Sequence, residues 1–262
     1  MFAHTHAATL SFLLIFAAQS AGCFDGTSLP DEASPSCGSQ PQALVNTEGL
    51  TSHNCGRDNV FIVARNERDG QLACAGVTRA ISFFKQWNLQ SEKPIEIIIA
   101  EDISPLRVEQ GFSWEIVYGF LDPRDLRVYM GPYALVNKNS GLMSLPFSEE
   151  FYISYVAHEV THILAQHFYG HACKLMPKEQ QEYIAYFSQI STLNPELRKE
   201  IIDAFAEKRW EPFAGIHDIH PGYHDMNPAG FAVKSYIYGS TPEGQKVFRD
   251  YLAGTVPPRL DQ

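Results

Sequence analysis

Positive charge is scarce in this sequence of 262 residues, where 20 Lys and Arg stand against 30 Asp and Glu, a formal net charge of −10. An acidic surface repels phosphate backbones and anionic lipid, so we expect neither a nucleic-acid partner nor binding to a membrane surface. Charged residues make up only 19% of the chain, whereas hydrophobic residues make up 45%. That balance is enough to bury a core and excludes a disordered or fibrous protein.

The first 22 residues lack Asp, Glu, Lys and Arg. Residues 10–18 form an apolar run that is too short to span a bilayer, and small residues follow it. This layout is typical of a secretory signal peptide over residues 1–22, although the basic residues usual at its start are missing. No later segment approaches eighteen uncharged apolar residues, so we expect no transmembrane span after the signal. The mature chain is therefore predicted to be secreted or periplasmic.

The sequence also lacks a C-x-x-C pair, which argues against a zinc site built from cysteines. Its five cysteines are Cys23, Cys37, Cys55, Cys74 and Cys173. In an oxidising compartment we expect disulfides among the last four, and three pairings are open. The segment Ser-Ala-Gly before Cys23 resembles a bacterial lipoprotein box. Cys23 would then be the lipid anchor of the mature chain, and a free thiol is the alternative for the odd cysteine.

Regular apolar periodicity is missing from residues 23–57, which are rich in Pro, Ser, Gly and Cys. We interpret this segment as a disulfide-pinned lead-in to a single domain over residues 58–262. In the first half of that domain, apolar runs predict strands, and helical spacing predicts one helix over residues 72–87. The predicted strands are residues 60–64, 95–100, 114–121 and 126–130, of which the last two form a hairpin.

Helical patterns dominate the chain after residue 148. Ser148 is a suitable residue to start the first of these helices, and Gly170 is a suitable stop. Four further helices are expected, over residues 178–193, 195–210, 228–238 and 242–252. Because the helices gather after the strands, we predict an α+β fold: a small N-terminal sheet with one helix, followed by a helical half.

Seven of the ten histidines fall between residues 158 and 224, and the sharpest pattern among them is His158-Glu159-Val160-Thr161-His162. Two histidines four residues apart lie one above the other on a helix, so their rings can hold one zinc ion. Glu159 projects beside them and can accept a proton from a zinc-bound water. The alternative is a chance match on an ordinary helix.

An ideal helix, with about 100° per residue, separates this group from the apolar residues of the same segment. His162 then lies near 40° and Glu159 near 100° from His158, whereas the apolar residues at 156, 160, 163 and 164 fall at roughly 140–240°. We therefore expect a helix that packs against the core on one side and opens to a cleft on the other. His167 falls on the core side, which makes it a poor third ligand.

Two histidines do not complete a catalytic zinc site, which takes three protein ligands and a water. Glu182 follows His162 by twenty residues, in the next predicted helix, which can fold back and present a carboxylate to the metal. Here the sequence resembles the gluzincin group of zinc metallopeptidases, over residues 148 to about 190. The resemblance implies that His158, His162 and Glu182 bind Zn²⁺ and that Glu159 is the general base.

Residues 216–225, further along the chain, are rich in imidazole and carboxylate groups. In gluzincins a downstream His or Tyr hydrogen-bonds the oxyanion of the tetrahedral intermediate. The candidates for this role are His217, His220, Tyr223 and His224. A turn with exposed or capping histidines, or a second metal site, would explain the same segment.

These patterns predict an exported zinc metallopeptidase with a peptide or protein substrate. The resemblance also implies an edge strand that aligns the substrate by main-chain pairing, for which residues 126–130 are the candidate. Glu179, one turn before Glu182, is the substitute third ligand. Two alternatives remain: a non-catalytic zinc-binding or interaction protein with a degenerate peptidase fold, and a metal-assisted hydrolase of a non-peptide amide such as a cell-wall crosslink.

Overall fold

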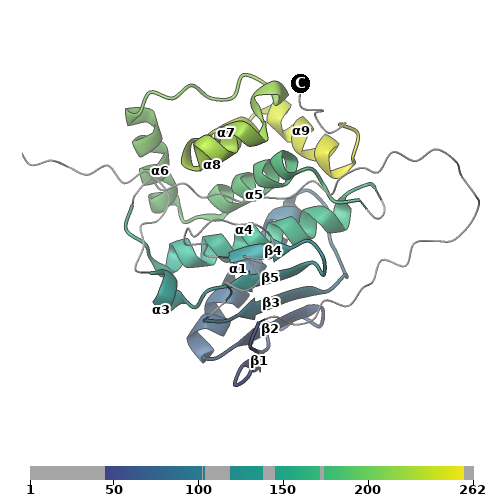
Figure 1. Ribbon diagram of the computed structural model, residues 1–262. Helices are drawn as coiled ribbons and strands as arrows, with labels where there is room; N and C mark the ends of the chain where they lie inside the picture. Colours follow the sequence, from purple (N-terminus) through teal and green to yellow (C-terminus); the bar gives the residue numbers. More distant parts are fainter. Residues whose placement is uncertain (1–44, 102, 104–118, 138–144, 172–173, 257–262) are drawn as a thin grey trace, which may run out of the picture.

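A computed structural model describes residues 45–101, 103, 119–137, 145–171 and 174–256 (Figure 1). The predicted signal peptide lies outside the described residues, as do Cys23, Cys37, Cys173 and the start of the predicted strand 114–121. Among the described residues, no helix combines the length and the apolar character that a membrane crossing requires.

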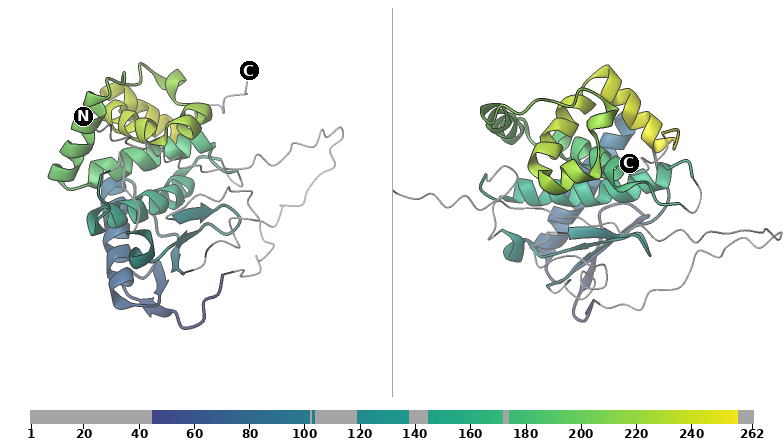
Figure 2. Two further views of the ribbon diagram at one scale, coloured as in Figure 1. Left: turned by 60° about the vertical axis from the view of Figure 1, so that its left-hand side comes forward. Right: turned by 45° about the horizontal axis from the view of Figure 1, so that its top comes forward.

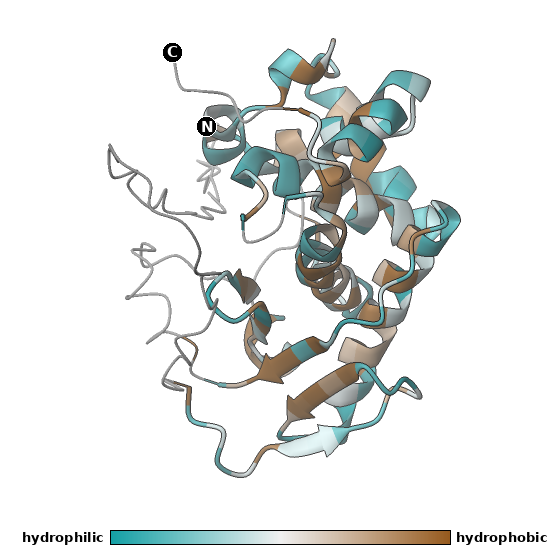
Figure 3. Cartoon of the chain, turned by 90° about the vertical axis from the view of Figure 1, so that its right-hand side faces the viewer, coloured by the Kyte–Doolittle hydropathy of each residue, from teal (hydrophilic) through white to brown (hydrophobic). Residues whose placement is uncertain are grey.

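Five strands form one mixed sheet with the order β1-β2-β3-β5-β4. The strands are β1 (Thr51–His53), β2 (Val60–Ala64), β3 (Ile95–Ile99), β4 (Gly119–Asp122) and β5 (Arg127–Met130). The three central strands, β2, β3 and β5, are parallel, whereas β1 and β4 are antiparallel to their neighbours. Apolar residues concentrate in these central strands (Figure 3). β2 and β3 are rich in Ile and Val, and burial alternates along both strands, so one face of each strand is buried more deeply than the other.

Eight α-helices accompany the sheet in the described residues. They are α1 (Glu67–Gln86), α3 (Tyr133–Val136), α4 (Glu149–Phe168), α5 (Lys178–Thr192), α6 (Pro195–Glu207), α7 (Pro221–Met226), α8 (Pro228–Gly239) and α9 (Pro242–Leu252). Six of them begin after a residue whose side chain accepts a hydrogen bond from the first turn, which is a strong local start signal. These capping residues are Asn66, Ser148, Asn194, His220, Asn227 and Thr241.

The helices are layered on the sheet, which confirms the predicted α+β fold (Figure 1). α1 connects the parallel strands β2 and β3 and packs against α4. α5 lies on α4, and α8 lies on α5, so that successive layers lead away from the sheet (Figure 2). The helix α4 is therefore enclosed between the sheet side and α5, and every residue from Phe151 to Ala165 except Ile153 is buried.

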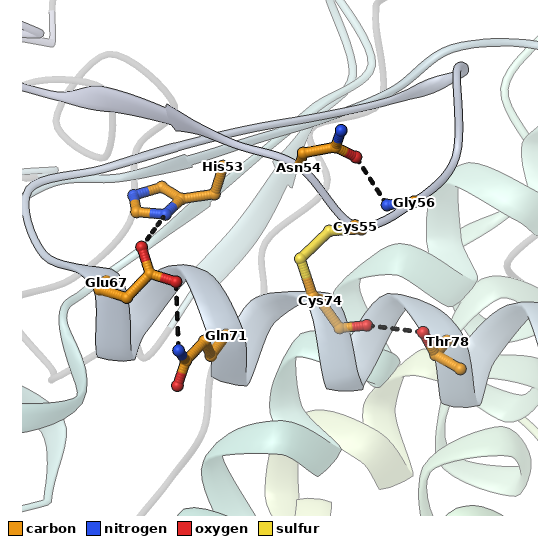
Figure 4. Close-up of a disulfide and its surroundings, with 8 residues drawn as sticks. All are labelled: His53, Asn54, Cys55, Gly56, Glu67, Gln71, Cys74 and Thr78. Carbon is orange, nitrogen blue, oxygen red and sulfur yellow. Dashed lines mark hydrogen bonds and ion pairs between the residues drawn. A yellow bond between two sulfur atoms is a disulfide. The ribbon is translucent and has the colours of Figure 1, made fainter.

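The ordered sheet begins earlier than the predicted start of the domain at residue 58. β1 falls within the segment 23–57. It pairs antiparallel with β2 and so forms one edge of the sheet. A disulfide between Cys55 and Cys74 then ties the chain after β1 to α1 (Figure 4). This bond realises one of the pairings that the cysteine pattern allowed, and it fixes part of the predicted lead-in to the core.

The predicted edge strand for substrate, residues 126–130, is not at an edge. Within it, β5 lies between β3 and β4 and is hydrogen-bonded on both sides. The predicted hairpin is confirmed for β4 and β5. Of these two strands, β4 is the outer one, at the opposite edge of the described sheet from β1. A strand that follows a hairpin turn can pair inward or outward, and sequence alone does not decide which.

Candidate metal centre

The helix α4 brings His158, Glu159 and His162 together, as their spacing predicts. Ser148 starts the helix by accepting a hydrogen bond from the backbone of Phe151, as the sequence predicts. The expected opening of this face to a cleft is wrong for the described structure, since the exposed fractions are 1% for His158, 2% for Glu159 and 5% for His162. Layers packed on both sides of α4 cover the polar face as well as the apolar one.

The helix α5 supplies the third group, Glu182, which is 3% exposed. His158 Nε2 lies 3.2 Å from His162 Nε2 and 3.4 Å from Glu182 Oε2, and His162 Nε2 lies 3.9 Å from Glu182 Oε1. One ligand atom from each of the three residues lies within 4.8 Å of the others, and this group could hold a metal ion. Glu179, the substitute ligand, is not part of the group.

The two shorter separations, 3.2 Å and 3.4 Å, match a tetrahedral metal ion, and the third is longer at 3.9 Å. Bonds of about 2.0–2.1 Å to nitrogen and oxygen place neighbouring ligand atoms about 3.3 Å apart. Glu182 Oε2 is also buried and makes no hydrogen bond to the described residues. A buried carboxylate oxygen without a hydrogen bond is costly, and a cation would remove that cost.

Glu159 lies beside this group and next to the edge of the sheet. Its carboxylate accepts a hydrogen bond from the backbone N–H of Leu121 in β4, while Oε2 is buried without a hydrogen-bond partner among the described residues. Burial raises the pKa of Glu159 well above its usual value, and the charge of Glu182 raises it further. A divalent cation nearby would act in the opposite sense and favour the carboxylate, the form that a general base requires.

His162 and Glu182 have the protonation states that metal ligands require. Burial lowers the pKa of His162 to about 3, so its imidazole is neutral near neutral pH and keeps a lone pair for a ligand bond. Burial would raise the pKa of Glu182, but the imidazoles of His224, His162 and His158 outweigh it and hold that pKa below the usual range. Glu182 is therefore ionised near neutral pH.

The structure separates the four downstream candidates, because only His224 reaches the metal group. His224 is fully buried, and its Nε2 lies 3.7 Å from Glu182 Oε2. Its Nδ1 donates to Asp225 Oδ1 at 3.1 Å, and Lys178 Nζ donates to the same oxygen at 2.6 Å. Those two hydrogen bonds outweigh the burial of Asp225 and lower the pKa of its carboxyl group. The ring of His224 is thus held with Nε2 toward Glu182.

The remaining candidates have other contacts. His220 caps α7, where its Nδ1 accepts a hydrogen bond from the backbone of Tyr223 at 3.1 Å. The hydroxyl of Tyr223 accepts a hydrogen bond from Asn227 Nδ2 at 3.3 Å, and His217 is exposed. His167, expected to be a poor third ligand, lies with Nδ1 2.9 Å from Ser91 Oγ and outside the metal group.

Leu121 and Asp225 contact candidate residues, Lys178 contacts Asp225, and none of the three is identified from the sequence. Asp225 directly follows His224, and a carboxylate next to a candidate histidine was an available signal. The contacts of Lys178 and Leu121 arise because α7 lies on α5 and β4 lies beside α4, and no local pattern in the sequence encodes either arrangement.

In the metal-free protein, Glu159 and His162 make the free energy of unfolding depend on pH in opposite directions. Protonated Glu159 stabilises the fold below the pKa of an unfolded glutamate, 4.5, and this contribution is lost as the pH rises through the raised folded value. The contribution of His162 is complete above the unfolded value of 6.5 and is lost as the pH falls toward about 3. Each of the two groups changes the free energy of unfolding by at most about 1.4 kcal/mol per pH unit.

We therefore expect two variants with opposite behaviour in urea unfolding of the metal-free chain between about pH 5 and about pH 7. Glu159→Gln keeps the imidazole of His162 and should become less stable as the pH falls. His162→Gln keeps the carboxyl group of Glu159 and should become less stable as the pH rises. Slopes of the same sign in both variants would contradict this assignment of the buried protons.

A protein family of unknown function, DUF6639, matches residues 60–260. No curated protein and no solved structure matches the chain. The matched region includes the sheet from β2 onward, the group His158, His162 and Glu182, and the helix α7. Because the match covers well over half of the chain, the protein belongs to the DUF6639 family, whose function is unknown.

Proposed function

We propose that this protein is a zinc-dependent metallopeptidase of the gluzincin type. One observation carries the proposal: Glu159 places a second buried carboxylate, with an oxygen that makes no hydrogen bond to the described residues, beside the convergent group of His158, His162 and Glu182. A site that only held a metal would not need this group, because three ligands are already present. A general base does need a carboxylate with a free oxygen.

Zinc is the metal that this donor set favours. Two imidazole nitrogens and one carboxylate are one of the ligand sets of catalytic zinc sites, which leave the fourth position to water or substrate. Zinc held there would lower the pKa of a bound water to about 7 and polarise a substrate carbonyl.

The protein side chains would then perform the proton transfers. Glu159 accepts the proton of the attacking water and returns it to the leaving amine. The oxyanion role requires the imidazolium form of His224, with a proton on each ring nitrogen: Nδ1–H donates to Asp225 and keeps the ring oriented, and Nε2–H would donate to the oxyanion that develops on the substrate carbonyl. His220 and Tyr223 have no such role in this proposal.

The position of β4 favours an extended peptide as substrate. β4 is one of the two outer strands of the described sheet, and the backbone N–H of its residue Leu121 donates a hydrogen bond to the proposed general base, Glu159. A peptide that pairs with an outer strand by main-chain hydrogen bonds is held in an extended form, with specificity set by its side chains. β4 therefore replaces residues 126–130 as the candidate for aligning the substrate.

We further propose that the protein is exported, as residues 1–22 predict. The disulfide between Cys55 and Cys74 supports export, because such bonds persist in oxidising compartments. Whether Cys23 carries a lipid can be read from the mass of the mature protein.

A non-catalytic metal-binding protein is the second candidate, and the burial of the ligands favours it. The exposed fractions of the three ligand residues are 5% or less, as in a site that is closed to substrate. A metal-assisted hydrolase of a non-peptide amide would use the same side chains with another substrate.

The decisive experiment combines metal analysis with a digest of a broad substrate. The purified mature chain should contain about one zinc per molecule and should cleave casein or a peptide library. Cleavage should stop when a chelator removes the metal. Activity should return when zinc is restored. Zinc at this stoichiometry without any peptide cleavage would support the non-catalytic candidate, and cleavage that resists the chelator would overturn the metal mechanism.

Replacement of His224 tests the oxyanion role. We expect His224→Gln to lower kcat by about 10²- to 10³-fold, the usual cost of removing one oxyanion donor, while the zinc content stays unchanged. His220→Asn is the matched control, because asparagine preserves the cap of α7, and its kcat should stay within about threefold of wild type. A loss of zinc from His224→Gln would instead identify His224 as a metal ligand.

A further inference from the structure

A buried chain of hydrogen bonds leads from α4 across to α5 and back to the metal group. Ser154 Oγ donates to the backbone carbonyl of Phe151 at 2.8 Å, and Gln189 Nε2 donates to Ser154 Oγ at 3.2 Å. Gln189 Oε1 lies 3.1 Å from His158 Nδ1. Ser154 is fully buried and Gln189 is 1% exposed, so these contacts are protected from solvent.

The order of donors in this chain determines the state of His158. A serine hydroxyl has one proton, and here that proton goes to the carbonyl of Phe151. Ser154 Oγ can then only accept from Gln189, so the NH₂ end of the amide faces Ser154 and the oxygen faces His158. An amide oxygen only accepts, and therefore Nδ1 of His158 carries the proton.

This arrangement prepares His158 for a metal. In a neutral imidazole with a proton on Nδ1, the lone pair is on Nε2, and Nε2 is the atom that lies near His162 and Glu182. Gln189 follows Glu182 by seven residues, about two turns of α5, so one face of that helix presents both groups. The two helices thus supply the ligands and the group that orients one of them.

His162 differs from His158 in this respect. Its Nδ1 is buried and has no hydrogen-bond partner among the described residues. Its Nε2 contacts His158 Nε2 at 3.2 Å, so of the two ligand rings only that of His158 has a side-chain acceptor at Nδ1 among these residues. Control of the tautomer is therefore concentrated at His158.

We propose that Gln189 is a positioning residue of the metal site, which holds the Nδ1–H tautomer of His158 through its side-chain oxygen. The proposal rests on metal binding by the proposed site, and it does not require peptidase activity. Hydrogen-bond partners of ligating histidines typically contribute 10- to 100-fold to metal affinity.

Two variants of similar size separate this role from packing. Gln189→Met fills the same space without an acceptor, whereas Gln189→Glu keeps an acceptor oxygen. The full mature chain is used, and two quantities are measured: the tautomer of His158 from ¹⁵N NMR of the metal-free protein, and the zinc affinity from competition with a chromophoric chelator. Thermal unfolding of each variant verifies that it is folded.

We expect wild type to carry the proton on Nδ1 of His158 and Gln189→Glu to do the same, with a zinc affinity within about threefold of wild type or tighter. Gln189→Met should populate the other tautomer and bind zinc about 10- to 100-fold more weakly. Ser154→Ala should weaken zinc binding in the same direction but less, because the amide of Gln189 is then free to turn. If Gln189→Met does not fold, the comparison of Ser154→Ala with Gln189→Glu tests the proposal in its place.

Three results would overturn the inference: a proton on Nε2 of His158 in wild type, equal weakening by the Met and Glu variants, or unchanged zinc affinity in Gln189→Met and Ser154→Ala. Absence of zinc binding by wild type would overturn it together with the proposed function. Zinc binding that depends on Gln189 in a protein without peptidase activity would leave the inference standing and remove only the proposed function.

Discussion

The Glu159→Gln variant should bind zinc like wild type, and its kcat should fall by about 10²- to 10⁴-fold, the usual contribution of a general base. Glutamine has nearly the same shape and still accepts the hydrogen bond from Leu121, so the neighbouring ligands should keep their positions. It cannot accept a proton from water. The measurement is kcat on a peptide that wild type cleaves, with zinc determined on the same sample.

Glu200→Gln is the matched control for this variant. Glu200 is exposed on α6 and should show wild-type kcat and zinc content. The fold should tolerate Glu159→Gln, because Glu159 is buried and its pKa is raised, which means that the metal-free protein already favours an uncharged side chain there. A Glu159→Gln variant that retains wild-type kcat would exclude Glu159 as the base, whatever its zinc content.

The sequence predicts the geometry best where it depends on neighbouring residues within one helix or strand. The relation of His158, Glu159 and His162 follows from helical periodicity, and the structure brings both imidazoles to one point. The bounds of β2 and α9 agree with the predicted ones, since an apolar run and a proline start are local signals. Glu182 was identifiable because a helix that returns antiparallel after a short connection meets the preceding helix at a predictable distance.

Choices that depend on tertiary packing could not be made from the sequence. His220, Tyr223 and His224 lie within five residues, and the helix α7 decides between them by turning His224 toward α5. That helix was not predicted, because residues 221–226 are too few for a periodic pattern. In the same way, the order of pairing in the sheet places β4 outside β5, and the apolar pattern of the hairpin does not encode that order.

The burial of the site has the same origin. Helical angles predicted that the polar face of α4 would open to a cleft, and these angles describe only which residues share a face. They do not say what covers that face. The helix α5 covers it, and the packing that excludes water also strengthens the electrostatic interactions among Glu159, Glu182 and the imidazoles.

Replacement of Glu182 should have the largest effect on metal binding. Loss of a hydrogen-bond partner of a ligand typically costs 10- to 100-fold in affinity, so Glu182→Gln, which removes the charged ligand itself, should weaken zinc binding by more than about 100-fold. Zinc at 100 times the wild-type Kd stabilises wild type by about 2.7 kcal/mol. The same concentration should stabilise Glu182→Gln by about 0.4 kcal/mol or less, and thermal unfolding with and without zinc measures both values.

Glu179→Gln separates the loss of a ligand from the loss of a nearby charge. Glu179 is one turn from Glu182 on α5 and is also buried, but it lies outside the group whose ligand atoms converge. Its variant should keep the zinc-dependent stabilisation of wild type, whereas Glu182→Gln should lose it. If the two variants exchange these results, Glu179 is the third ligand. If both retain full stabilisation, the carboxylate of α5 does not bind the metal, and a site made of His158, His162 and a further histidine such as His224 accounts for the bound zinc.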